Sequence, residues 1–287
     1  MSQTMPTILD ATERVDLHMH TTYSDGHWAP AALFDHLAAE HFRVVAVTDH
    51  DRTDSVAEMV ALGAARGIRV IRGVEMTTNW QGDIAHLLCY GWQPDGALAE
   101  VARETLADQL ANAQAVHAAL VRQGLTFPRQ AEVLADKGGA VNHPRDNIAL
   151  LVAHGHAPDS RAAVEIVTAA GHRTASAPLA RAVAAAHADG GVAIVAHPGR
   201  GESNAFASFA PERLAAIRAE GIPLDGIEVF YPTYTEAQRT MYAAFARDDG
   251  WLISSGSDSH GPRQRYPIPY PASGIAPLLA RLGVVVR

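Results

Sequence analysis

Short apolar segments recur along this chain, and most of them end at a histidine or a carboxylate. They are about four to six residues long, mostly do not alternate with polar residues, and cover residues 15–19, 43–48, 69–74, 84–89, 192–196, 225–230 and 251–255. Such runs are typical of strands that are buried on both faces, as in a parallel sheet. Helical stretches lie between several of them, for example at 30–40 and 55–66, so the sequence predicts repeated βα units with right-handed crossovers.

Repeated βα units fit either a closed barrel or a doubly wound sheet, and the positions of the polar residues favour the barrel. In a βα barrel the functional groups lie at the C-terminal ends of several strands. An open sheet confines its site to one crevice where the strand order reverses. Because polar groups follow six separate segments here, we expect an α/β barrel.

The middle of the chain differs from the rest. Residues 97–186 are rich in alanine, have helical periodicity and contain no run comparable to the apolar segments. We interpret them as a helical insertion that caps the barrel mouth, so that residues 15–96 and 187–287 form the barrel domain. Residues 1–14 lack the charged start and apolar centre of a secretion signal, and we expect a short N-terminal extension there.

Composition limits the partners of this 287-residue chain. Acidic residues number 31 against 23 basic ones, a net charge of −8, and Lys137 is the sole lysine. No basic run is available to hold a long nucleic-acid backbone. No apolar stretch approaches the roughly 20 residues of a membrane helix. Cys89 is the single cysteine, which excludes an intrachain disulfide and favours the cytoplasm. The oligomeric state is not predicted.

Potential metal ligands dominate the chemistry of the segment ends. His18 and His20 are two apart on one strand, so their side chains point to the same face, and Asp258 and His260 repeat this spacing. Imidazole and carboxylate suit borderline divalent ions such as Zn, Mn or Fe. The candidate ligands are too many for one ion and predict a cluster of two or three: His18, His20, Asp25, His50, Glu75, His86, His197, Asp258 and His260.

We expect different roles for two carboxylates near the segment ends, Glu75 and Asp49. Glu75 closes a buried strand, where a carboxylate without a cation is costly, so we expect it to bridge two metal ions. Asp49 precedes His50 and is better placed to orient an imidazole from behind than to bind the metal itself.

The set His18-x-His20, Thr48-Asp49-His50, Glu75, His197-Pro198 and Asp258-x-His260 resembles the PHP (polymerase and histidinol phosphatase) superfamily. The resemblance covers nearly the whole chain from Val15 and implies a distorted (βα)7 TIM-like barrel with a trinuclear metal centre. The segments 196–200 and 226–232 resemble the small-molecule branch. That branch contains the nucleoside 3′,5′-bisphosphate phosphatases and the 5′–3′ oligoribonucleases, which carry a helical insert.

Carried over by position, the resemblance implies three metal positions. One is formed by His18, His20, Glu75 and Asp258, which we expect to be essential for catalysis. A second takes Glu75, His86 and His197, and a third Asp25, His50 and His260. Arg145 and Arg200 correspond to arginines that approach the substrate phosphates, and a planar guanidinium can grip a phosphate at two points. Asn147 stands where the family has histidine, and the segment 171–176 also departs from the family pattern.

The resemblance implies a metal-dependent phosphoesterase in which a metal-bridging hydroxide attacks phosphorus in line. We expect a phosphatase of small phosphorylated metabolites, nucleoside 3′,5′-bisphosphates first. The alternatives are a 5′–3′ exonuclease on short RNA, a phosphodiesterase or cyclic phosphate hydrolase of the same fold, an inactive binding module, and an amidohydrolase. The complete ligand set disfavours the binding module, and the Asp258-x-His260 ending disfavours the amidohydrolase.

Other residues are weaker candidates for the pocket. Asn147 can donate a hydrogen bond to phosphate, Trp80 can stack on a base, and Arg52 can reach a phosphate. Arg263 and Arg265 can form a rim for a second phosphate. The remaining candidates are Tyr231 and Tyr234, as pocket-lining side chains, and Glu228, as a structural carboxylate.

Overall fold

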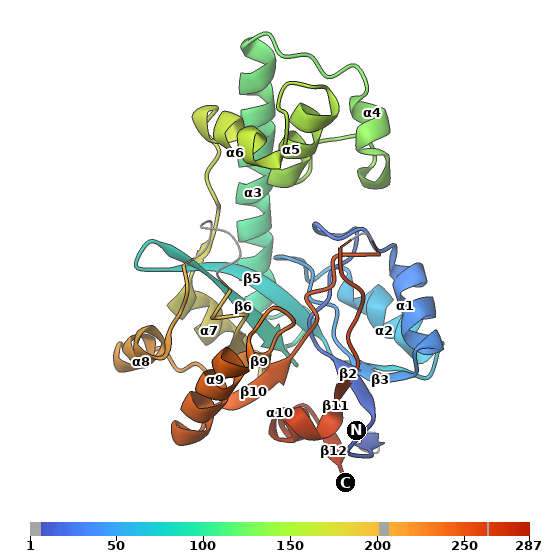
Figure 1. Cartoon of the computed structure of the whole chain (residues 1–287), viewed down its shortest axis with the longest axis vertical. Helices are drawn as coiled ribbons and strands as arrows, with labels where there is room; N and C mark the ends of the chain where they lie inside the picture. The colour runs from blue at the N-terminus through green and yellow to red at the C-terminus, as the bar shows by residue number, and fades with distance from the viewer. Residues whose placement is uncertain (1–6, 201–206, 263) are drawn as a thin grey trace. The chain divides into compact units, whose positions relative to one another are not determined.

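The computed structural model describes residues 7–200, 207–262 and 264–287. The chain divides into two compact units (Figure 1): unit 1 comprises Met1–Ala102 and Ser176–Arg287, and unit 2 comprises Arg103–Ala175. Unit 1 contains all the described strands, whereas unit 2 is helical. The predicted α/β class is therefore confirmed, and the role of the helical part as a cap stays a prediction.

The largest sheet of unit 1 has six strands in the order β10-β9-β8-β6-β5-β7. These strands are β5 (Gly73–Trp80), β6 (Asp83–Tyr90), β7 (Ala177–Pro178), β8 (Val192–Val195), β9 (Gly226–Phe230) and β10 (Leu252–Ser255). Strands β8, β9 and β10 run parallel to one another, as their unalternated apolar sequences predict. Strand β6 pairs antiparallel with both β5 and β8.

Two smaller sheets complete unit 1. The order β11-β2-β3-β4 joins β2 (Arg14–Asp16), β3 (Phe42–Val45), β4 (Arg69–Val70) and β11 (Tyr270–Pro271). Strand β1 (Thr7–Leu9) pairs in parallel with β12 (Val284–Val286). Residues 7–9, which we expected in an N-terminal extension, are thus part of a sheet, and Leu9 is buried.

The described part of the chain contains no closed ring of strands, so of the predicted distorted (βα)7 barrel the α/β class is confirmed and closure is not. Its strands form three sheets, which isolated bridges connect at Met19–Ser259 and His50–Glu75. The strands also depart from seven repeated βα units, because a tight hairpin joins β5 to β6. Gln81 and Gly82 both have positive φ, 52° and 88°, as a two-residue hairpin turn of the primed kind requires. A connection of two residues can reverse a strand but cannot cross over to a parallel one.

Side chains from the two larger sheets nevertheless share one core. Val15 and Val44 of the four-stranded sheet lie in the same buried cluster as Leu88 and Ile194 of the six-stranded sheet. This arrangement brings the C-terminal ends of β2 and β3 close to those of β8 and β10. The polar residues that follow these strands can therefore meet.

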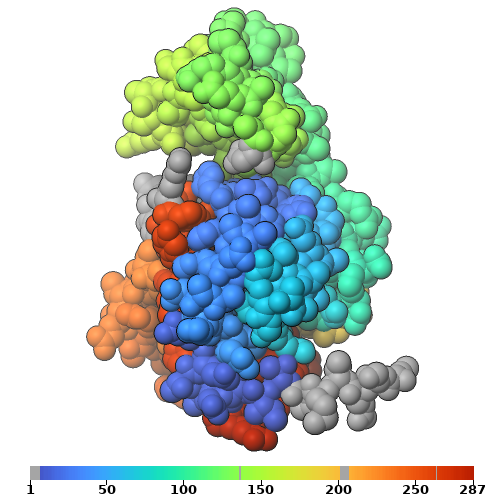
Figure 2. Space-filling model, turned by 90° about the vertical axis from the view of Figure 1, so that its right-hand side faces the viewer, coloured from blue at the N-terminus to red at the C-terminus, as the bar shows by residue number. Residues whose placement is uncertain are grey.

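Helices cover the sheets of unit 1. They are α1 (Pro30–Ala39), α2 (Val56–Ala64), α7 (Leu179–Ala188), α8 (Pro211–Ala219), α9 (Glu236–Asp248) and α10 (Ala276–Arg281), with the short 3-10 helix η2 (Ala272–Ile275). Figure 1 shows α9 beside β9 and β10, which it contacts. Helices α1 and α2 contact each other, and their blue and light blue surfaces adjoin in Figure 2.

Unit 2 is built from most of α3 (Ala97–Arg122), which begins in unit 1, and from α4 (Gln130–Val133), η1 (Ala135–Lys137), α5 (Pro144–Ala153) and α6 (Ser160–Ala169). Its core includes Val116, Leu120, Leu151 and Val167. Helix α5 starts with a capping box between His143 and Asp146, which satisfies backbone donors at the helix start. None of the described helices is long and apolar enough to span a membrane.

Candidate metal centre

All the predicted ligands lie in unit 1, most of them in segments that follow a strand. Glu75, which we expected to close a strand, instead lies near the start of β5. His18, His20 and Asp25 follow β2, His50 follows β3, and His197 follows β8. Glu75 and His86 lie within the β5–β6 hairpin, on the same face, since His86 pairs with Thr77 and Glu75 is two residues before Thr77. Asp258 and His260 follow β10. The side chains that we predicted to converge do converge.

The first cluster joins His18, His20, Glu75 and Asp258, all buried, with potential ligand atoms within 4.8 Å of one another. Nε2 of His18 and Nε2 of His20 each lie 3.0 Å from Oε2 of Glu75. Oδ1 of Asp258 lies 3.2 Å from Nε2 of His20 and 3.5 Å from Nε2 of His18. This is the first set of ligands implied by the family resemblance.

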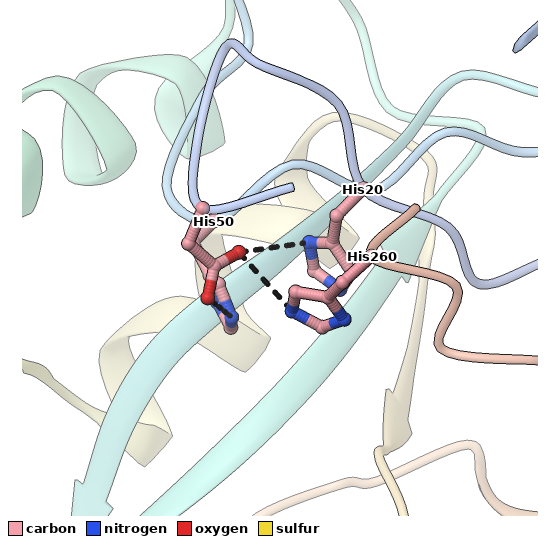
Figure 3. A group of neighbouring side chains, drawn as sticks. His20, His50 and His260 are labelled. Atoms are coloured by element: carbon pink, nitrogen blue, oxygen red, sulfur yellow. Dashed lines mark ion pairs between the residues drawn. The ribbon is translucent and has the colours of Figure 1, made fainter. Parts of the chain in front are cut away.

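The second cluster surrounds Asp25 and contains His20, His50 and His260. Figure 3 shows the three imidazole rings gathered around a carboxylate, with dashed ion pairs to it. Asp25 Oδ1 lies 3.2 Å from Nε2 of His260 and 3.7 Å from Nδ1 of His20, and its Oδ2 lies 3.9 Å from Nε2 of His50. His20 thus joins the predicted set of Asp25, His50 and His260.

The third cluster contains His50, Glu75 and His86. Nδ1 of His86 lies 3.1 Å from Oε1 of Glu75, and Nε2 of His197 lies 3.1 Å from the same oxygen. Nε2 of His50 lies 3.5 Å from Oε2 of Glu75. The two oxygens of Glu75 therefore face different sets of imidazoles: Oε2 faces His18, His20 and His50, and Oε1 faces His86 and His197. This is the arrangement that a bridging carboxylate needs.

The charges of the clusters are strongly coupled. Burial alone would raise the pKa of Glu75, but neighbouring His18 and His50 hold it well below its usual value. Burial would lower the pKa of His20, but Asp258 and Glu75 raise it to about 10. Burial lowers the pKa of His50 well below its usual value. Protons thus offset part of the carboxylate charge when no cation is bound, and metal binding would release them.

Several buried atoms in the clusters lack a hydrogen bond, which tests whether the site fits divalent cations. Both ring nitrogens of His20, Nδ1 of His50 and Nε2 of His260 meet no hydrogen-bond partner among the described residues, although they are shielded from solvent. Such buried polar atoms are costly unless a ligand satisfies them. With their imidazole and carboxylate donors, the clusters fit borderline divalent ions.

Two of the predicted ligands have a strained backbone. His197 has φ 28° and Asp258 has φ 52°, in the left-handed region that costs a non-glycine residue about 1–3 kcal/mol. Both follow the last residue of a strand by two or three positions. From this backbone conformation both side chains reach the clusters.

The role predicted for Asp49 is wrong. Its carboxylate accepts hydrogen bonds from Thr21 N, Thr21 Oγ1 and Ser24 Oγ, at 2.7, 2.7 and 2.6 Å, and not from an imidazole. Asp49 therefore anchors the turn that carries Asp25. Glu228 instead takes the role of a carboxylate that orients an imidazole ligand. Its Oε1 lies 3.1 Å from Nδ1 of His18, the ring nitrogen that faces away from the cluster.

Arginines lie on the outer side of Asp258. Nη1 of Arg200 lies 3.3 Å from Oδ2 of Asp258, and Nη1 of Arg265 lies 3.9 Å from it. Tyr231 donates a hydrogen bond of 2.9 Å to the same oxygen. The guanidinium of Arg265 also lies over the Tyr231 ring. Arg265 was only a minor candidate in the sequence, and its neighbour Arg263 lies outside the described residues.

The weaker candidates from the sequence contact residues other than the predicted metal ligands. Asn147 is 1% exposed inside unit 2, where it donates to the Ala113 carbonyl. Trp80 is buried at the end of β5 and donates to Glu220. Arg52 pairs with Asp54 at 2.8 Å. The prediction that these side chains line the pocket is therefore wrong for Asn147 and Trp80, and Arg52 makes a surface pair. Arg145 lies at the start of α5 in unit 2, and its contact with phosphate stays a prediction.

Sequence reasoning missed Asp16, which connects three loops of unit 1. This fully buried carboxylate accepts hydrogen bonds from the backbone N–H groups of His18, Ser257 and Ile268, at 3.2, 3.0 and 3.0 Å. Burial raises its pKa to about 6. The position of Asp16, two residues before His18 in a buried strand, was the available signal.

Comparisons with known proteins agree with this geometry. A family model described as the PHP domain matches residues 16–169. The chain is 30% identical to the 3′,5′-nucleoside bisphosphate phosphatase of Chromobacterium violaceum, across 86% of this chain and 87% of that protein. It is 32% identical to the 5′–3′ exoribonuclease Rnm of Escherichia coli, across 86% and 85% of the two chains.

A solved structure is also similar over nearly the whole length. It is that of a proposed metal-dependent phosphoesterase from Bifidobacterium adolescentis, with a TM-score of 0.76 and 25% identity. The superposition covers 94% of this chain and 96% of that one. The fold of this chain therefore has a counterpart among solved structures.

Proposed function

This chain belongs to the PHP domain family and is a phosphoesterase of that family, and from this premise we propose that it is a metal-dependent phosphatase of small nucleotides. The substrate that we favour is a nucleoside 3′,5′-bisphosphate, from which the enzyme would release inorganic phosphate. The observation that carries the proposal is the convergence of three overlapping clusters, two of which contain Glu75, with the arginines beside Asp258.

The clusters support a centre of two or three divalent ions, of Mn, Zn or Fe. In the proposed arrangement the ligands are those of the three clusters together with His197. Bound ions would supply an activated water and positive charge against the phosphoryl oxygens. The chain's own contribution is to hold these ligands in place before the substrate arrives, since a preorganised site needs no rearrangement at the moment of reaction.

Arg200 is the side chain proposed to bind the transferred phosphoryl group. It contacts the outer oxygen of Asp258, whose inner oxygen faces His18 and His20. A phosphate at the clusters would therefore lie within reach of a guanidinium. The fork of N–H groups in arginine matches phosphate oxygens at two points, and charge neutralisation is most of what phosphoryl transfer requires. Arg145 is proposed as a second phosphate contact on the sequence resemblance alone.

Charge favours a small substrate over a long one. The net charge of the chain is −8, and several arginines outside the centre are paired with acids, as in Arg66–Asp35, Arg173–Asp108 and Arg213–Asp83. Binding to a long nucleic acid depends on many cationic contacts to its backbone. The cations near the clusters are enough for one or two phosphate groups.

The alternative is a 5′–3′ exonuclease on short RNA. The relative identities favour neither activity, at 30% for the phosphatase and 32% for the exoribonuclease. Both reactions use the same metal ligands, and an exonuclease differs in holding several nucleotides at once. Hydrolysis of a cyclic phosphate on the same fold is a further alternative.

One assay separates these activities. The purified protein, supplied separately with Mn, Zn and Fe, would be incubated with a nucleoside 3′,5′-bisphosphate, a 5′-phosphorylated short oligoribonucleotide and a cyclic nucleotide. Release of inorganic phosphate from the bisphosphate, with a kcat/KM well above that for mononucleotide release from RNA, is the expected result. The opposite order would assign the exonuclease, and no phosphate release from any substrate would overturn the proposal.

A further inference from the structure

Strand β9 supplies none of the ligands in the three clusters. Two side chains of its segment nevertheless contact two of those ligands, His18 and Asp258, on the side that faces away from the cluster. Glu228 lies in the middle of the strand and is fully buried. Tyr231 follows its last residue and is 1% exposed. Both side chains approach the first cluster, which His18, His20, Glu75 and Asp258 form.

Glu228 contacts His18 on the ring nitrogen that faces away from the cluster. Nδ1 of His18 lies 3.1 and 3.3 Å from the two oxygens of Glu228. Oε2 of Glu228 also accepts a 2.9 Å hydrogen bond from the backbone N–H of His197. A carboxylate at this distance holds the proton on Nδ1, which leaves Nε2 of His18 unprotonated when a cation binds.

Tyr231 fixes the orientation of the Asp258 carboxylate. Its hydroxyl donates to Oδ2 at 2.9 Å, while Oδ1 faces the imidazoles of His18 and His20. Nη1 of Arg200 donates to the same oxygen at 3.3 Å. The two donors together hold Oδ2 on the outer side and present Oδ1 to the cluster, and Tyr231 makes the shorter of the two hydrogen bonds.

The other imidazoles of the clusters are held differently. Nδ1 of His260 lies 3.0 Å from the backbone carbonyl of Asp258. Among the described residues, Nδ1 of His50 and both ring nitrogens of His20 have no hydrogen bond at all. A carboxylate partner raises the basicity of an imidazole more than a carbonyl does, because it carries a full charge. His18 is thus the best supported of these ligands.

We propose that Glu228 and Tyr231 are positioning residues that make the first cluster the tightest of the metal positions. The proposal rests on the proposed function only in assuming that the clusters bind divalent cations. The two side chains touch neither substrate nor metal. They act through His18 and Asp258, whose orientation they fix before a cation arrives, so that less freedom is lost on binding.

The test is a titration of the metal-free protein with Zn²⁺ in competition with a chromophoric chelator. The wild type should bind a first equivalent more tightly than the others. Glu228→Gln should weaken that first step about 10- to 100-fold and leave the later steps within about twofold. Tyr231→Phe should weaken the same step by about tenfold or less, because one hydrogen bond is lost.

Matched controls separate positioning from folding. Asp189 is a buried carboxylate that accepts the backbone N–H groups of Ala97 and Leu98, at 2.9 Å each. Tyr242 is a buried tyrosine whose hydroxyl donates to the Phe209 carbonyl. Asp189→Asn and Tyr242→Phe should leave the first Zn²⁺ step unchanged. Equal loss of that step in these controls, or no loss in Glu228→Gln and Tyr231→Phe, overturns the proposal.

A second measurement needs no variant. In the Zn²⁺-loaded wild type, long-range ¹H–¹⁵N spectra should show His18 protonated on Nδ1 and bound through Nε2. The reverse tautomer overturns the proposal even if the variants fail to fold. Neither measurement uses turnover. A protein without phosphatase activity would therefore contradict the proposed function and leave the assignment of Glu228 and Tyr231 intact.

Discussion

Nη1 of Arg200 lies 3.3 Å from Oδ2 of Asp258, so the guanidinium group is held against the outer oxygen of this carboxylate. The inner oxygen, Oδ1, belongs to the candidate metal centre. This contact gives Arg200 two functions that can be separated: it fixes its own guanidinium near the clusters, and it offers that guanidinium to phosphate. The first requires only a positive charge, whereas the second uses the planar fork.

Arg200→Ala should lower kcat/KM for phosphate release by about a hundredfold or more, the size expected when a transition-state donor is removed. Arg200→Lys should recover only part of this, because a lysine retains the charge but cannot grip phosphate at two points. Steady-state kinetics check the prediction, with Arg218→Ala, an exposed arginine beside Asp249, as the control. Full activity in Arg200→Ala would show that phosphate binds elsewhere.

Removal of a central ligand should remove metal and activity together. His20 belongs to two clusters and Asp258 to one, so we expect His20→Ala and Asp258→Ala to lose metal retention and turnover. Elemental analysis of the purified variants, beside phosphate release, measures both. His187→Ala changes a histidine that pairs with Asp225 away from the clusters and should keep its metal. A metal-depleted variant with normal activity would contradict the assigned centre.

Metal should also stabilise the fold. Buried carboxylates without cations are costly, and an ion that binds only the native state adds about 2.7 kcal/mol at 100 times its Kd. We therefore expect a chelator to lower the melting temperature and added Mn²⁺ or Zn²⁺ to restore it. An unchanged melting temperature after verified metal removal would argue against cation binding in the clusters.

Tyr234→Phe should destabilise the loop that carries Arg200. The backbone N–H of Gly199 donates to the Tyr234 hydroxyl at 2.5 Å in a buried environment, and the variant would leave this donor unsatisfied, at a cost of about 1–3 kcal/mol. Urea unfolding measures the loss. KM for the phosphate substrate should rise because Arg200 is less well held. An unchanged free energy of unfolding would mean that water replaces the hydroxyl.

Unit 2 should lose stability in mild acid. Partial burial lowers the pKa of His172, so the folded protein disfavours the charged imidazole. Above the usual pKa of about 6.5 the group is neutral in both states and has no effect. As the pH falls below that value, the unfolded chain gains a proton that the folded chain resists, and the free energy of unfolding decreases.

The contribution of His172 can be isolated with a variant. His172→Gln removes the titrating group, so the stability of the variant should depend less on pH between about 5 and 7 than that of the wild type. Thermal unfolding of metal-free protein at a series of pH values gives both curves. Parallel curves would exclude His172 as the source.

The residues of the centre were predictable because their chemistry and their place on strands are both local. His18, His20 and His50 follow unalternated apolar runs, and strands of that kind carry their functional groups at their C-terminal ends. The pairing of β5 with β6 was not recognised, because Gln81 and Gly82 form the whole connection and the sequence was interpreted as two parallel strands. Asp-Gly and Asn-Gly are the usual signals for such a turn, and this chain has neither there.

The supporting contacts could not be predicted, because they join residues far apart in the chain. Glu228 lies 210 positions after His18, and no local sequence pattern near either residue indicates that the two side chains are in contact. Asp49 stands next to a ligand but points to Thr21 and Ser24. Asn147 stands at a position where the family has histidine and is nevertheless buried, so its position in the sequence did not reveal its environment.

The hairpin of β5 and β6 ties the spacing of two metal ligands to the length of one turn. Glu75 and His86 share a face only because two residues, Gln81 and Gly82, separate the paired ends of the strands. Adding or deleting a single residue there, with β6 re-paired by one position, would move His86 to the opposite face. Most loops of an enzyme can change length during evolution with little penalty. The length of the turn between β5 and β6 is expected to be nearly fixed, because it sets the register of two metal ligands.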